Sequence, residues 1–312
     1  MAGTEKVHIL GCGAIGLTLA AYLVADGRSV VAVRTSKHDV STDRITVTVH
    51  SGVDTVPNVP VETVSLSRLT KLDGIVVVTA KSYANNAIAS ALGNKVVTGP
   101  LVIMQNGVGV EHPFLDSPFA QIYRCILYAT SQSASENEVT FRSIASSPIG
   151  TVKGLESNLE QCVRALTTRG FQFHPERNIQ REIWKKAIMN SVFNSICSLL
   201  DVDNGVFVRD KEVAKLASEI VSECVILAEA SGISLTESEL LEQIMIISKG
   251  SEGQLISTLQ DIRSGRETEI EYLNLEMARI ASSMKPKINL GKTELLGNMI
   301  LAKSRYAVPC NR

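Results

Sequence analysis

The sequence predicts an α/β protein in which a doubly wound α/β domain is followed by an all-helical domain. Two observations predict this fold class. Short apolar runs that are typical of buried strands recur up to about residue 174, starting with Val7–Leu10. From about Ile179 the pattern changes to helical segments with few strand-like runs. We therefore expect a first domain over residues 1–177 and a helical domain over residues 178–312.

A glycine-rich loop follows the first expected strand. The stretch Val7–Gly16 reads Val-His-Ile-Leu-Gly-Cys-Gly-Ala-Ile-Gly, and an apolar helical pattern comes after it. Its first glycine permits the tight turn, its second lets the backbone approach a pyrophosphate, and its third lets the helix pack on the strand. The helix N-terminus then directs N–H groups at the phosphates. The pattern favours a Rossmann-type dinucleotide site, with a bare structural turn as the alternative; its residues are Gly11, Cys12, Gly13, Ala14, Ile15 and Gly16.

The end of the second expected strand indicates which dinucleotide is bound. Ser29–Val33 is a β-branched run, and Arg34-Thr35-Ser36-Lys37 follows it. An NAD-specific site usually places Asp or Glu about 20 residues after the loop, where it binds the ribose hydroxyls. Here a guanidinium, two hydroxyls and an ammonium suit a 2′-phosphate instead. We expect NADP(H), bound in part by Arg34, while a solvated basic turn is the alternative.

Two later strands lead to polar residues at the sheet edge where ligands bind in such folds. Gly74–Thr79 is a continuous apolar run, typical of a fully buried parallel strand, and it leads to Lys81. Leu101–Gln105 leads in the same way to Asn106. Because ligands bind outside the carboxyl ends of parallel strands, Lys81 and Asn106 are candidates for contact with the nicotinamide or the substrate. For Lys81, a plain surface lysine is an open alternative.

The rest of the first domain completes the sheet and adds a helix. We expect strands at Ile45–His50, Val59–Val64, Arg124–Ser131, Val139–Arg142 and Phe171–His174, the third and fourth in an antiparallel section, and a helix at Leu155–Thr168. In the second domain we expect helices at Ile183–Leu200, Glu212–Ser231, Thr236–Ser248, Ile270–Met284 and Thr293–Lys303. Gly232 closes the second of these, and a Thr-Glu-Ser-Glu capping arrangement opens the third.

Composition excludes several classes of protein. The 312 residues carry 31 Lys and Arg against 32 Asp and Glu, a net charge of −1, so neither nucleic acid nor an anionic membrane is an expected partner. The six cysteines stand singly with no C-x-x-C pair, which argues against disulfide frameworks and metal sites. No run approaches the ~18 apolar residues that span a bilayer. We expect a soluble, cytoplasmic protein.

A polar stripe marks the first helix of the second domain. Lys186, Asn190 and Asn194 recur every four residues, so they share one helix face. Burying two asparagines without partners costs about 1–3 kcal/mol each, so a stripe of this kind suggests a ligand that supplies the partners. The alternative is a solvated face with Lys185 and Lys186 outside.

The order of these motifs resembles the ketopantoate reductase family over essentially the whole chain. The matching residues are the glycine loop, Arg34, Lys81, Gln105–Gly109, Trp184–Asn194, Asn204-Gly205, and the run from Ser257 through Thr268-Glu269 to Asn274. The resemblance implies an NADPH-dependent enzyme that reduces 2-dehydropantoate, a 2-oxo acid, to (R)-pantoate for pantothenate and coenzyme A synthesis.

The resemblance also implies roles, position by position. Lys186 matches the proton donor to the developing alkoxide. Asn106 matches a residue that contacts both cofactor and substrate, and Lys81 and Glu269 match positions near the nicotinamide end of the cofactor. The residues that match substrate-binding positions are Asn190, Asn194, Asn204 and Ser257.

Two departures from the family pattern concern the substrate. Leu275 stands where the family commonly has glycine, and Gln254 stands where asparagine can be found. Extra bulk near the substrate would affect which 2-oxo acid is reduced more than the chemistry itself. The alternatives are a D-2-hydroxyacid dehydrogenase acting on another branched 2-oxo acid, and a non-catalytic NADP-binding sensor. The expected partners are a small 2-oxo acid and a second copy of the chain in a homodimer.

Overall fold

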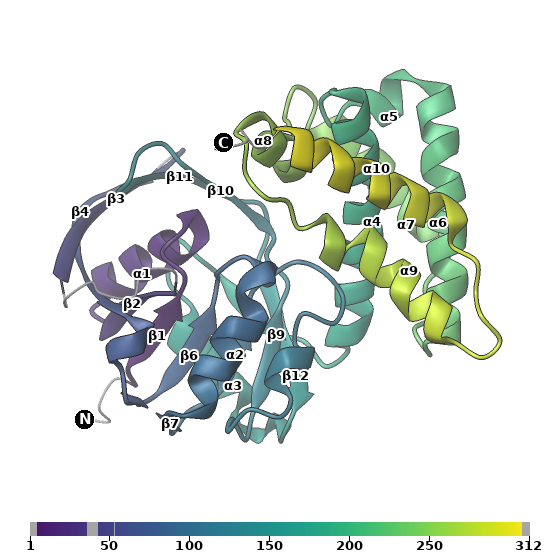
Figure 1. Cartoon of the computed structure of the whole chain (residues 1–312). Helices are drawn as coiled ribbons and strands as arrows, with labels where there is room; N and C mark the ends of the chain where they lie inside the picture. The colour runs from purple at the N-terminus through teal and green to yellow at the C-terminus, as the bar shows by residue number, and fades with distance from the viewer. Residues whose placement is uncertain (1–4, 36–42, 53, 308–312) are drawn as a thin grey trace. The chain divides into compact units, whose positions relative to one another are not determined.

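The computed structural model describes residues 5–35, 43–52 and 54–307, which form two compact units (Figure 1). The first unit takes in the chain up to Gln105 and then Val110–Ile179. The second takes in Asn106–Gly109 and the chain from Gln180 onward. A four-residue segment shortly after strand β8 (Leu101–Ile103) therefore belongs by its contacts to the helical unit, an assignment that the sequence pattern does not predict.

A mixed sheet of 11 strands, counted over the described residues, forms the first unit. Its centre is parallel, in the order β4-β2-β1-β6-β8-β9. The inner strands β1, β2, β6 and β8 are apolar, largely β-branched runs, as is typical of parallel strands with both faces buried, whereas β4 has exposed residues such as Pro60 and Glu62. Their bounds are β1 Val7–Leu10, β2 Val30–Arg34, β4 Asp54–Ser65, β6 Ile75–Val78, β8 Leu101–Ile103 and β9 Ile122–Cys125.

Antiparallel pairs extend the sheet beyond both sides of this centre. On one side, β3 pairs antiparallel with β4, β11 pairs parallel with β3, and β10 forms the edge, antiparallel to β11. On the other side, β12 pairs antiparallel with β9 and parallel with β13. The bounds are β3 Asp43–Ser51, β10 Ala129–Ser133, β11 Glu138–Ser143, β12 Ser147–Lys153 and β13 Phe173–Pro175, with β5 Lys71–Leu72 and β7 Val96–Val97 as a separate pair.

The expected single strand Arg124–Ser131 is wrong, because β9 ends at Cys125 and residues 126–128 belong to no strand. The backbone N–H of Ile126 donates to the carbonyl oxygen of Pro148 at 3.0 Å, and that of Tyr128 donates to the hydroxyl of Ser147 at 3.0 Å. The chain then re-enters the sheet as β10, at the edge beyond β11. The predicted run therefore contains the ends of two strands that are far apart in the sheet.

Helix α1, Ala14–Ala25, forms the core of the first unit. Every residue from Gly16 to Leu23 is buried, because β4, β3, β11 and β10 curve around the helix (Figure 1). A helix that is apolar on all sides requires such cover. Tyr22 of α1 meets Phe141 of β11 with ring centroids 5.6 Å apart, and Phe171 packs against Phe141 at 4.8 Å with the rings tilted by 45°.

The other helices of the first unit are shorter. They are α2 Asn85–Gly93 and α3 Leu159–Leu166, with 3₁₀ turns η1 Leu66–Arg68, η2 Ser82–Ala84, η3 His112–Phe114 and η4 Glu156–Asn158. The helix expected at Leu155–Thr168 is thus divided between η4 and α3. Helix α2 has no counterpart among the expected elements, because its sequence is short and opens with two asparagines.

The second unit is helical throughout the residues described. Its elements are α4 Ile179–Leu200, α5 Val206–Arg209, α6 Lys211–Ala230, α7 Glu237–Gly250, α8 Ser257–Arg263, η5 Ile270–Tyr272, α9 Asn274–Ser283 and α10 Gly291–Ala307. The expected helix Ile270–Met284 is broken at Leu273, whose φ and ψ of −114° and −101° are not helical. The predicted fold class, an α/β domain followed by an all-helical domain, is confirmed.

Two of the expected helix ends are confirmed in detail. The hydroxyl of Thr236 accepts the backbone N–H of Glu239 at 3.3 Å and so caps α7. Gly232, with φ of +78°, ends α6, and the backbone N–H of Ile233 returns to the carbonyl oxygen of Ala228.

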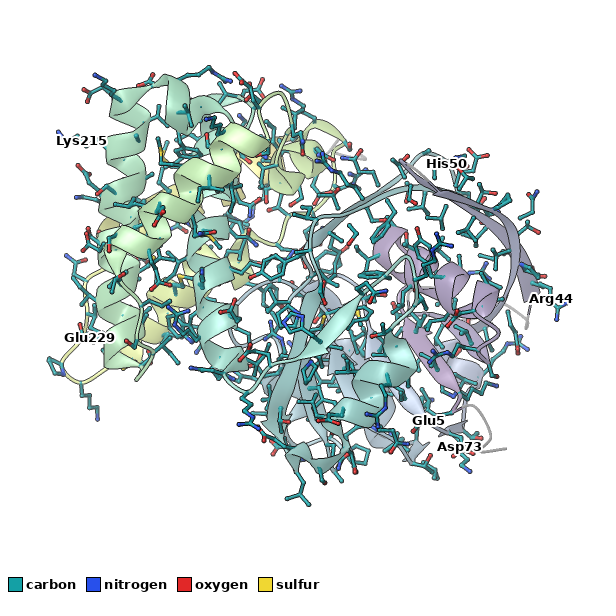
Figure 2. All side chains as sticks on the ribbon, turned by 180° about the vertical axis from the view of Figure 1, so that it is seen from behind. Glu5, Arg44, His50, Asp73, Lys215 and Glu229 are labelled. Carbon is teal, nitrogen blue, oxygen red and sulfur yellow. The ribbon has the colours of Figure 1, made fainter. Side chains whose placement is uncertain are left out.

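Charged side chains cover the outside of both units, as Arg44 and Lys215 illustrate (Figure 2). No helix in the described part of the chain is long and apolar enough to cross a membrane. Within the same residues, no group of three or more His, Cys, Asp or Glu side chains could hold a metal ion.

Candidate active site

The glycine loop lies at the carboxyl end of β1 and leads directly into α1. Gly11 has φ of +121°, and a Cβ there would overlap the backbone of Ala80 at the end of β6. A Cβ at Gly16 would overlap the carbonyl oxygen of Gly11 and lie 2.6 Å from the hydroxyl of Thr79. Glycine is therefore required at both positions, by backbone conformation in one case and by close packing in both.

Gly13 differs from the other two glycines because a Cβ there would meet open space. Gly13 is exposed and stands at the N-cap of α1, where no side chain caps the helix and no acidic residue lies in the first turn. The first N–H groups of α1 and its positive dipole end are thus left for an anion from outside the chain. This is the geometry on which a pyrophosphate binds.

Arg34 lies next to the glycine loop. Parallel pairing sets Leu10 beside Val33, and the backbone N–H of Gly11 donates to the carbonyl oxygen of Val33 at 2.9 Å. Burial raises the pKa of the Cys12 thiol to about 11, and the positive charge of Arg34 acts on the same group in the opposite direction. The half-buried Arg34 side chain therefore lies near the loop. Ser36 and Lys37, the other basic-turn residues of interest, lie outside the described residues.

Lys81 and Gln105 end neighbouring strands of the parallel centre. Lys81 is half-buried and stands just before η2, one residue after the Ala80 that packs on Gly11. Gln105 is buried, and its amide N–H groups donate to the carbonyl oxygen of Ala80 at 2.5 Å and to Oδ1 of Asn85 at 2.7 Å. In return, Asn85 Nδ2 donates to Gln105 Oε1 at 2.8 Å. This amide pair ties the two strand ends together.

Asn106 is half-buried and opens the segment Asn106–Gly109. Gly107 has φ of +106°, and a Cβ there would overlap the carbonyl oxygen of Tyr272 in η5. Glu269 is the N-cap residue of η5. Burial is the main cause that raises the pKa of the Tyr272 hydroxyl, and the negative charges of several carboxylates, including Glu269, raise it further. The structure thus brings the Asn106 segment and the Glu269 segment together within the second unit.

The polar stripe of α4 enters the interior of the helical unit. Lys186 and Asn190 are half-buried, and Asn194 is 3% exposed. The alternative of a fully solvated face is therefore wrong for Asn194. Its Oδ1 has no hydrogen-bond partner among the described residues. Lys185 turns to another neighbour, since its Nζ lies 3.9 Å from Glu239 Oε1 on α7.

Asn204 is the second buried asparagine of the helical unit, at 7% exposure. Its backbone N–H donates to the carbonyl oxygen of Gln254 at 2.9 Å, and its own carbonyl oxygen accepts the Ser248 hydroxyl at 2.7 Å. Its side-chain Oδ1 likewise lacks a partner within the described parts of the chain. The Gln254 contact sets Asn204 beside the strand-like segment that leads to Ser257, which is exposed as the first residue of α8.

Leu275 is half-buried at the second position of α9. A Cβ at Gly297 of α10 would lie 2.7 Å from Leu275 Cδ2. The leucine therefore packs on a glycine of the neighbouring helix, where the side chain of another residue would not fit. This contact lies within the α9–α10 pair, and the expected bulk of Leu275 beside the substrate stays a prediction.

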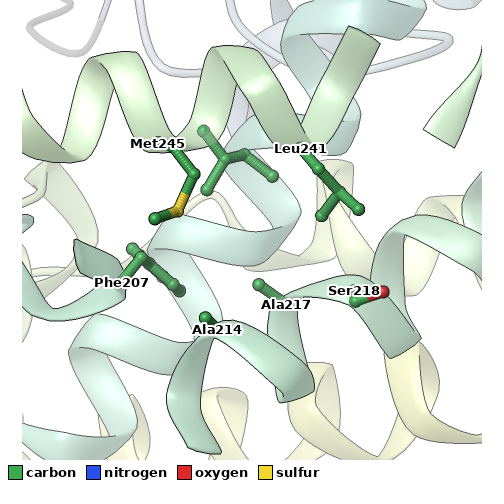
Figure 3. A pocket seen from close by; sticks show the side chains of 7 residues that line it. Phe207, Ala214, Ala217, Ser218, Leu241 and Met245 are labelled. Atoms are coloured by element: carbon green, nitrogen blue, oxygen red, sulfur yellow. The ribbon is translucent and has the colours of Figure 1, made fainter. Parts of the chain in front are cut away.

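A separate cavity of about 200 Å³ lies between α5, α6 and α7 (Figure 3). Its walls are apolar apart from one hydroxyl, and they contain none of the predicted site residues; they are Phe207, Ala214, Ala217, Ser218, Leu241, Ile244 and Met245. Nothing in this lining could neutralise a carboxylate, so a 2-oxo acid does not belong there.

Sequence reasoning missed the buried polar residues that support the site. Arg124 is fully buried in β9 and pairs with Glu111, and its Nη2 donates to the carbonyl oxygen of Gln105 at 3.1 Å. An arginine inside the apolar run Ile122–Cys125 is a signal for such a partner. Asn85 gave no comparable signal, because an asparagine near a helix start is common.

Taken together, the first unit is of the Rossmann type, with an open helix N-terminus and a neighbouring arginine. It precedes a helical unit with buried amide oxygens that have no partner in the described part of the chain. This combination defines the class of two-domain, pyridine-nucleotide-dependent oxidoreductases. Comparison with known proteins gives the family. A model of "Ketopantoate reductase PanE/ApbA" matches residues 7–154, and one of its C-terminal domain matches residues 178–303. The chain belongs to the ketopantoate reductase family.

Individual relatives agree with this assignment. A 2-dehydropantoate 2-reductase from Pyrococcus horikoshii is 26% identical over 90% of this chain and 93% of its own length. One from Halobacterium salinarum is 28% identical over 64% of this chain and 66% of its own length.

Solved structures show the same fold. A dimeric ketopantoate reductase from Staphylococcus aureus has a TM-score of 0.81 at 19% identity, over 97% of this chain and 99% of its own. A D-mandelate dehydrogenase bound to NADH and anilino(oxo)acetate has a TM-score of 0.82 at 20% identity, with the same coverage.

Proposed function

We propose that this protein reduces 2-dehydropantoate to (R)-pantoate with NADPH, as a step of pantothenate and coenzyme A biosynthesis. The family membership and the curated relatives support the reaction. The buried amide oxygens of Asn194 and Asn204 carry the choice of substrate. Each lacks a partner among the residues described, and each unpaired buried acceptor costs about 1–3 kcal/mol. A substrate hydroxyl can donate to such an oxygen, and 2-dehydropantoate carries one on C4.

The first unit fits the proposed cofactor. The open space at Gly13 and the uncapped N-terminus of α1 suit the pyrophosphate, with Cys12, Ala14 and Ile15 completing the loop. Arg34, which lies near this loop, suits a 2′-phosphate, since a guanidinium binds phosphate oxygens in a bidentate way. We therefore propose NADPH rather than NADH. Lys81, Asn106 and Glu269 are proposed to contact the cofactor near its nicotinamide.

The proposed chemistry assigns the acid to α4. Bound NADPH supplies the hydride that reduces C2 of the oxo acid. Negative charge then develops on the C2 oxygen, and Lys186 donates a proton to it from its ammonium group. Asn190, Asn194, Asn204 and Ser257 hold the substrate, and Asn106 aligns it with the cofactor. One proton and one hydride thus convert the ketone to a secondary alcohol.

One pair of substrates tests this proposal directly. 3,3-Dimethyl-2-oxobutanoate is 2-dehydropantoate with the C4 hydroxyl removed and otherwise the same carbon skeleton. A site that binds a substrate hydroxyl through buried acceptors rejects the analogue strongly, by about 10⁴-fold in favourable cases. We expect kcat/KM for NADPH oxidation to favour 2-dehydropantoate by at least roughly 100-fold. Equal values for the two acids would contradict the assignment of the substrate.

A second candidate is a D-2-hydroxyacid dehydrogenase acting on another 2-oxo acid. The similarity in fold to D-mandelate dehydrogenase favours this candidate. The same assay separates the two when phenylglyoxylate, 2-oxoisovalerate and NADH are included. Higher kcat/KM with one of these acids than with 2-dehydropantoate supports the second candidate. Cofactor binding without turnover of any acid would instead support a non-catalytic sensor.

A homodimer is the proposed assembly. Its support is the dimeric relative from Staphylococcus aureus, which shares the fold over nearly the whole chain. Light scattering on the eluting peak of a size-exclusion column should give about twice the 33.7 kDa mass of one chain. A mass of one chain at micromolar concentration would contradict it.

A further inference from the structure

We propose that the buried residues Asn85, Gln105, Glu111 and Arg124 are positioning residues that fix the segment Asn106–Gly109 and thereby align Asn106 for the reaction. We call these four residues the brace. The inference rests on the role proposed above for Asn106. It goes beyond that role because none of the four residues is proposed to touch substrate or cofactor.

The brace holds both ends of a segment only four residues long. At its start, the Gln105 side chain is bound by Asn85 and Ala80, and the Gln105 carbonyl oxygen accepts from Arg124 Nη2 at 3.1 Å. At its end, the carbonyl oxygen of Val110 accepts from Asn85 Nδ2 at 2.9 Å, and Glu111 pairs with Arg124. Asn85 and Arg124 therefore each hold both ends of the segment.

All four residues of the brace are buried, which favours one fixed arrangement. Asn85 is 1% exposed, Gln105 5%, Glu111 6% and Arg124 0%. Water does not compete for these bonds, so each is stronger than it would be at the surface. Between the two fixed ends, Gly107 has positive φ and leaves no room for a side chain against Tyr272. The peptide that carries Asn106 is thus restrained on three sides.

A network placed in this way has a specific consequence for rate. The Gln105–Asn106 peptide is oriented by its own carbonyl oxygen, which Arg124 binds. If that bond is lost, the Asn106 side chain moves relative to the reacting groups, and a misplacement of about 1 Å can cost ~10²-fold in rate. A brace that only stabilised the fold would change the unfolding temperature and leave the properties of Asn106 intact.

The test uses a substitution that retains the fold. In Arg124→Met/Glu111→Leu, both charges are replaced by apolar groups of similar volume, a change that is often neutral for stability. We expect near-normal thermal unfolding, a fall in kcat/KM for 2-dehydropantoate of at least about tenfold, and faster amide hydrogen exchange in the peptide that covers residues 106–109. The exposed pair Arg164–Glu160 is the matched control, and Arg164→Gln/Glu160→Gln should change none of these.

A double-mutant cycle between the brace and Asn106 tests whether the brace acts through Asn106. Asn106→Ala is measured in the wild type and in the Arg124→Met/Glu111→Leu background. If the brace acts through Asn106, Asn106→Ala lowers kcat/KM much less in the second background, because a misaligned Asn106 already contributes little to the rate there. Additive losses would overturn the proposal. If the double variant does not fold, Asn85→Ser, which removes the bonds to Gln105 and to Val110, is put through the same cycle. A wild type that turns over no 2-oxo acid would contradict the proposed function instead, while the exchange measurement would still test the brace.

Discussion

Arg34 ends β2 beside the glycine loop, close enough for its charge to act on the thiol of Cys12. This arrangement comes from the parallel pairing of β1 and β2, which places the last residue of one strand next to the turn after the other. A guanidinium at this position would bind the 2′-phosphate of a cofactor directly, so its role in binding does not depend on a contact with another side chain.

Arg34→Ala should therefore separate the two cofactors. We expect weaker NADPH binding, by roughly 10-fold or more, with NADH binding nearly unchanged, because only NADPH carries the phosphate that the guanidinium meets. Fluorescence titration of the reduced cofactors measures both affinities on the same preparation. Equal losses for NADPH and NADH would mean that Arg34 supports the loop and does not read the phosphate.

Lys185 and Lys186 provide a matched pair of neighbours on α4. Lys186→Ala should lower kcat by about 10²–10⁴-fold with NADPH binding intact, because general acid catalysis contributes on that scale. Lys185→Ala should leave kcat close to the wild-type value, since Lys185 lies by Glu239 on another helix and that partly exposed pair contributes at most about 1 kcal/mol to stability. Near-normal kcat in Lys186→Ala would assign the proton donor to another residue, and Lys81 would be tested next.

Helix α4 brings its polar residues into the helical unit at a spacing of four residues. The sequence alone indicated a shared face for Lys186, Asn190 and Asn194, because the period of a helix is fixed. It did not settle whether that face was buried, since burial depends on the packing of distant segments. Asn194 at 3% exposure answers that question for one residue of the stripe.

Asn194→Ala should raise the KM for 2-dehydropantoate by roughly 10-fold or more, if about 1–2 kcal/mol of substrate binding is lost. The affinity for NADPH should change little. The control is Asn298→Ala, at an exposed position within α10 of the same unit. Steady-state kinetics and a cofactor titration are both needed, because loss of NADPH binding in place of substrate binding would contradict the role proposed for the stripe.

The turn that carries Asn204 is held by an ion pair. Arg209 Nη2 lies 2.8 Å from Asp203 Oδ2, and the Asp203 carboxylate also accepts the backbone N–H of Gly205 at 2.7 Å. These bonds, led by the Arg209 side chain, lower the pKa of Asp203 to about 2. The folded-state pKa lies below the unfolded value of about 3.9, so the contribution to stability is complete above roughly pH 4 and is lost as the pH falls towards 2.

Asp203→Asn tests whether the ionised carboxylate stabilises the folded state. We expect a lower urea midpoint than in the wild type at pH 7, and a difference that narrows as the pH is lowered from about 4 to 2.5. Both side chains are partly exposed, so the difference should also shrink at high salt. A gap that is constant over this pH range would mean that the carboxylate charge does not stabilise the turn.

Over the whole molecule, bound cofactor should be visible as stability. A ligand at about 100 times its Kd stabilises the folded state by ~2.7 kcal/mol. With an unfolding entropy of about 2.1 cal/mol/K per residue, ~1 kcal/mol shifts the midpoint of a 312-residue chain by about 1.5 °C, so NADPH should raise the thermal midpoint by roughly 4 °C. NADH at the same concentration should raise it less. A larger shift with NADH, measured by differential scanning fluorimetry, would contradict the cofactor preference.

The sequence determined more of the molecule where structure is local. The glycine loop, the end of β2, the parallel strands β6 and β8 and the cap of α7 follow from residue types at short spacing. The chain's departure after Cys125, the pairing of β12 with β9 and the bonds of Arg124 join residues that are distant in sequence. The local pattern of residue types carries no information about such distant pairs. The sequence analysis therefore joined β9 and β10 into one strand and did not identify the brace.

The segment Asn106–Gly109 also limits how this chain could be recombined with its relatives. An exchange of genes at the Ile179/Gln180 junction looks like an exchange of whole units, but the helical unit includes four residues encoded far upstream. A chimera made at that junction would set one parent's Gly107 against the other parent's Tyr272 segment. Grafting the helical unit intact therefore needs a second, short insertion at residues 106–109. The two stretches of the gene that encode the helical unit, residues 106–109 and the part from residue 180 onward, therefore have to be exchanged together.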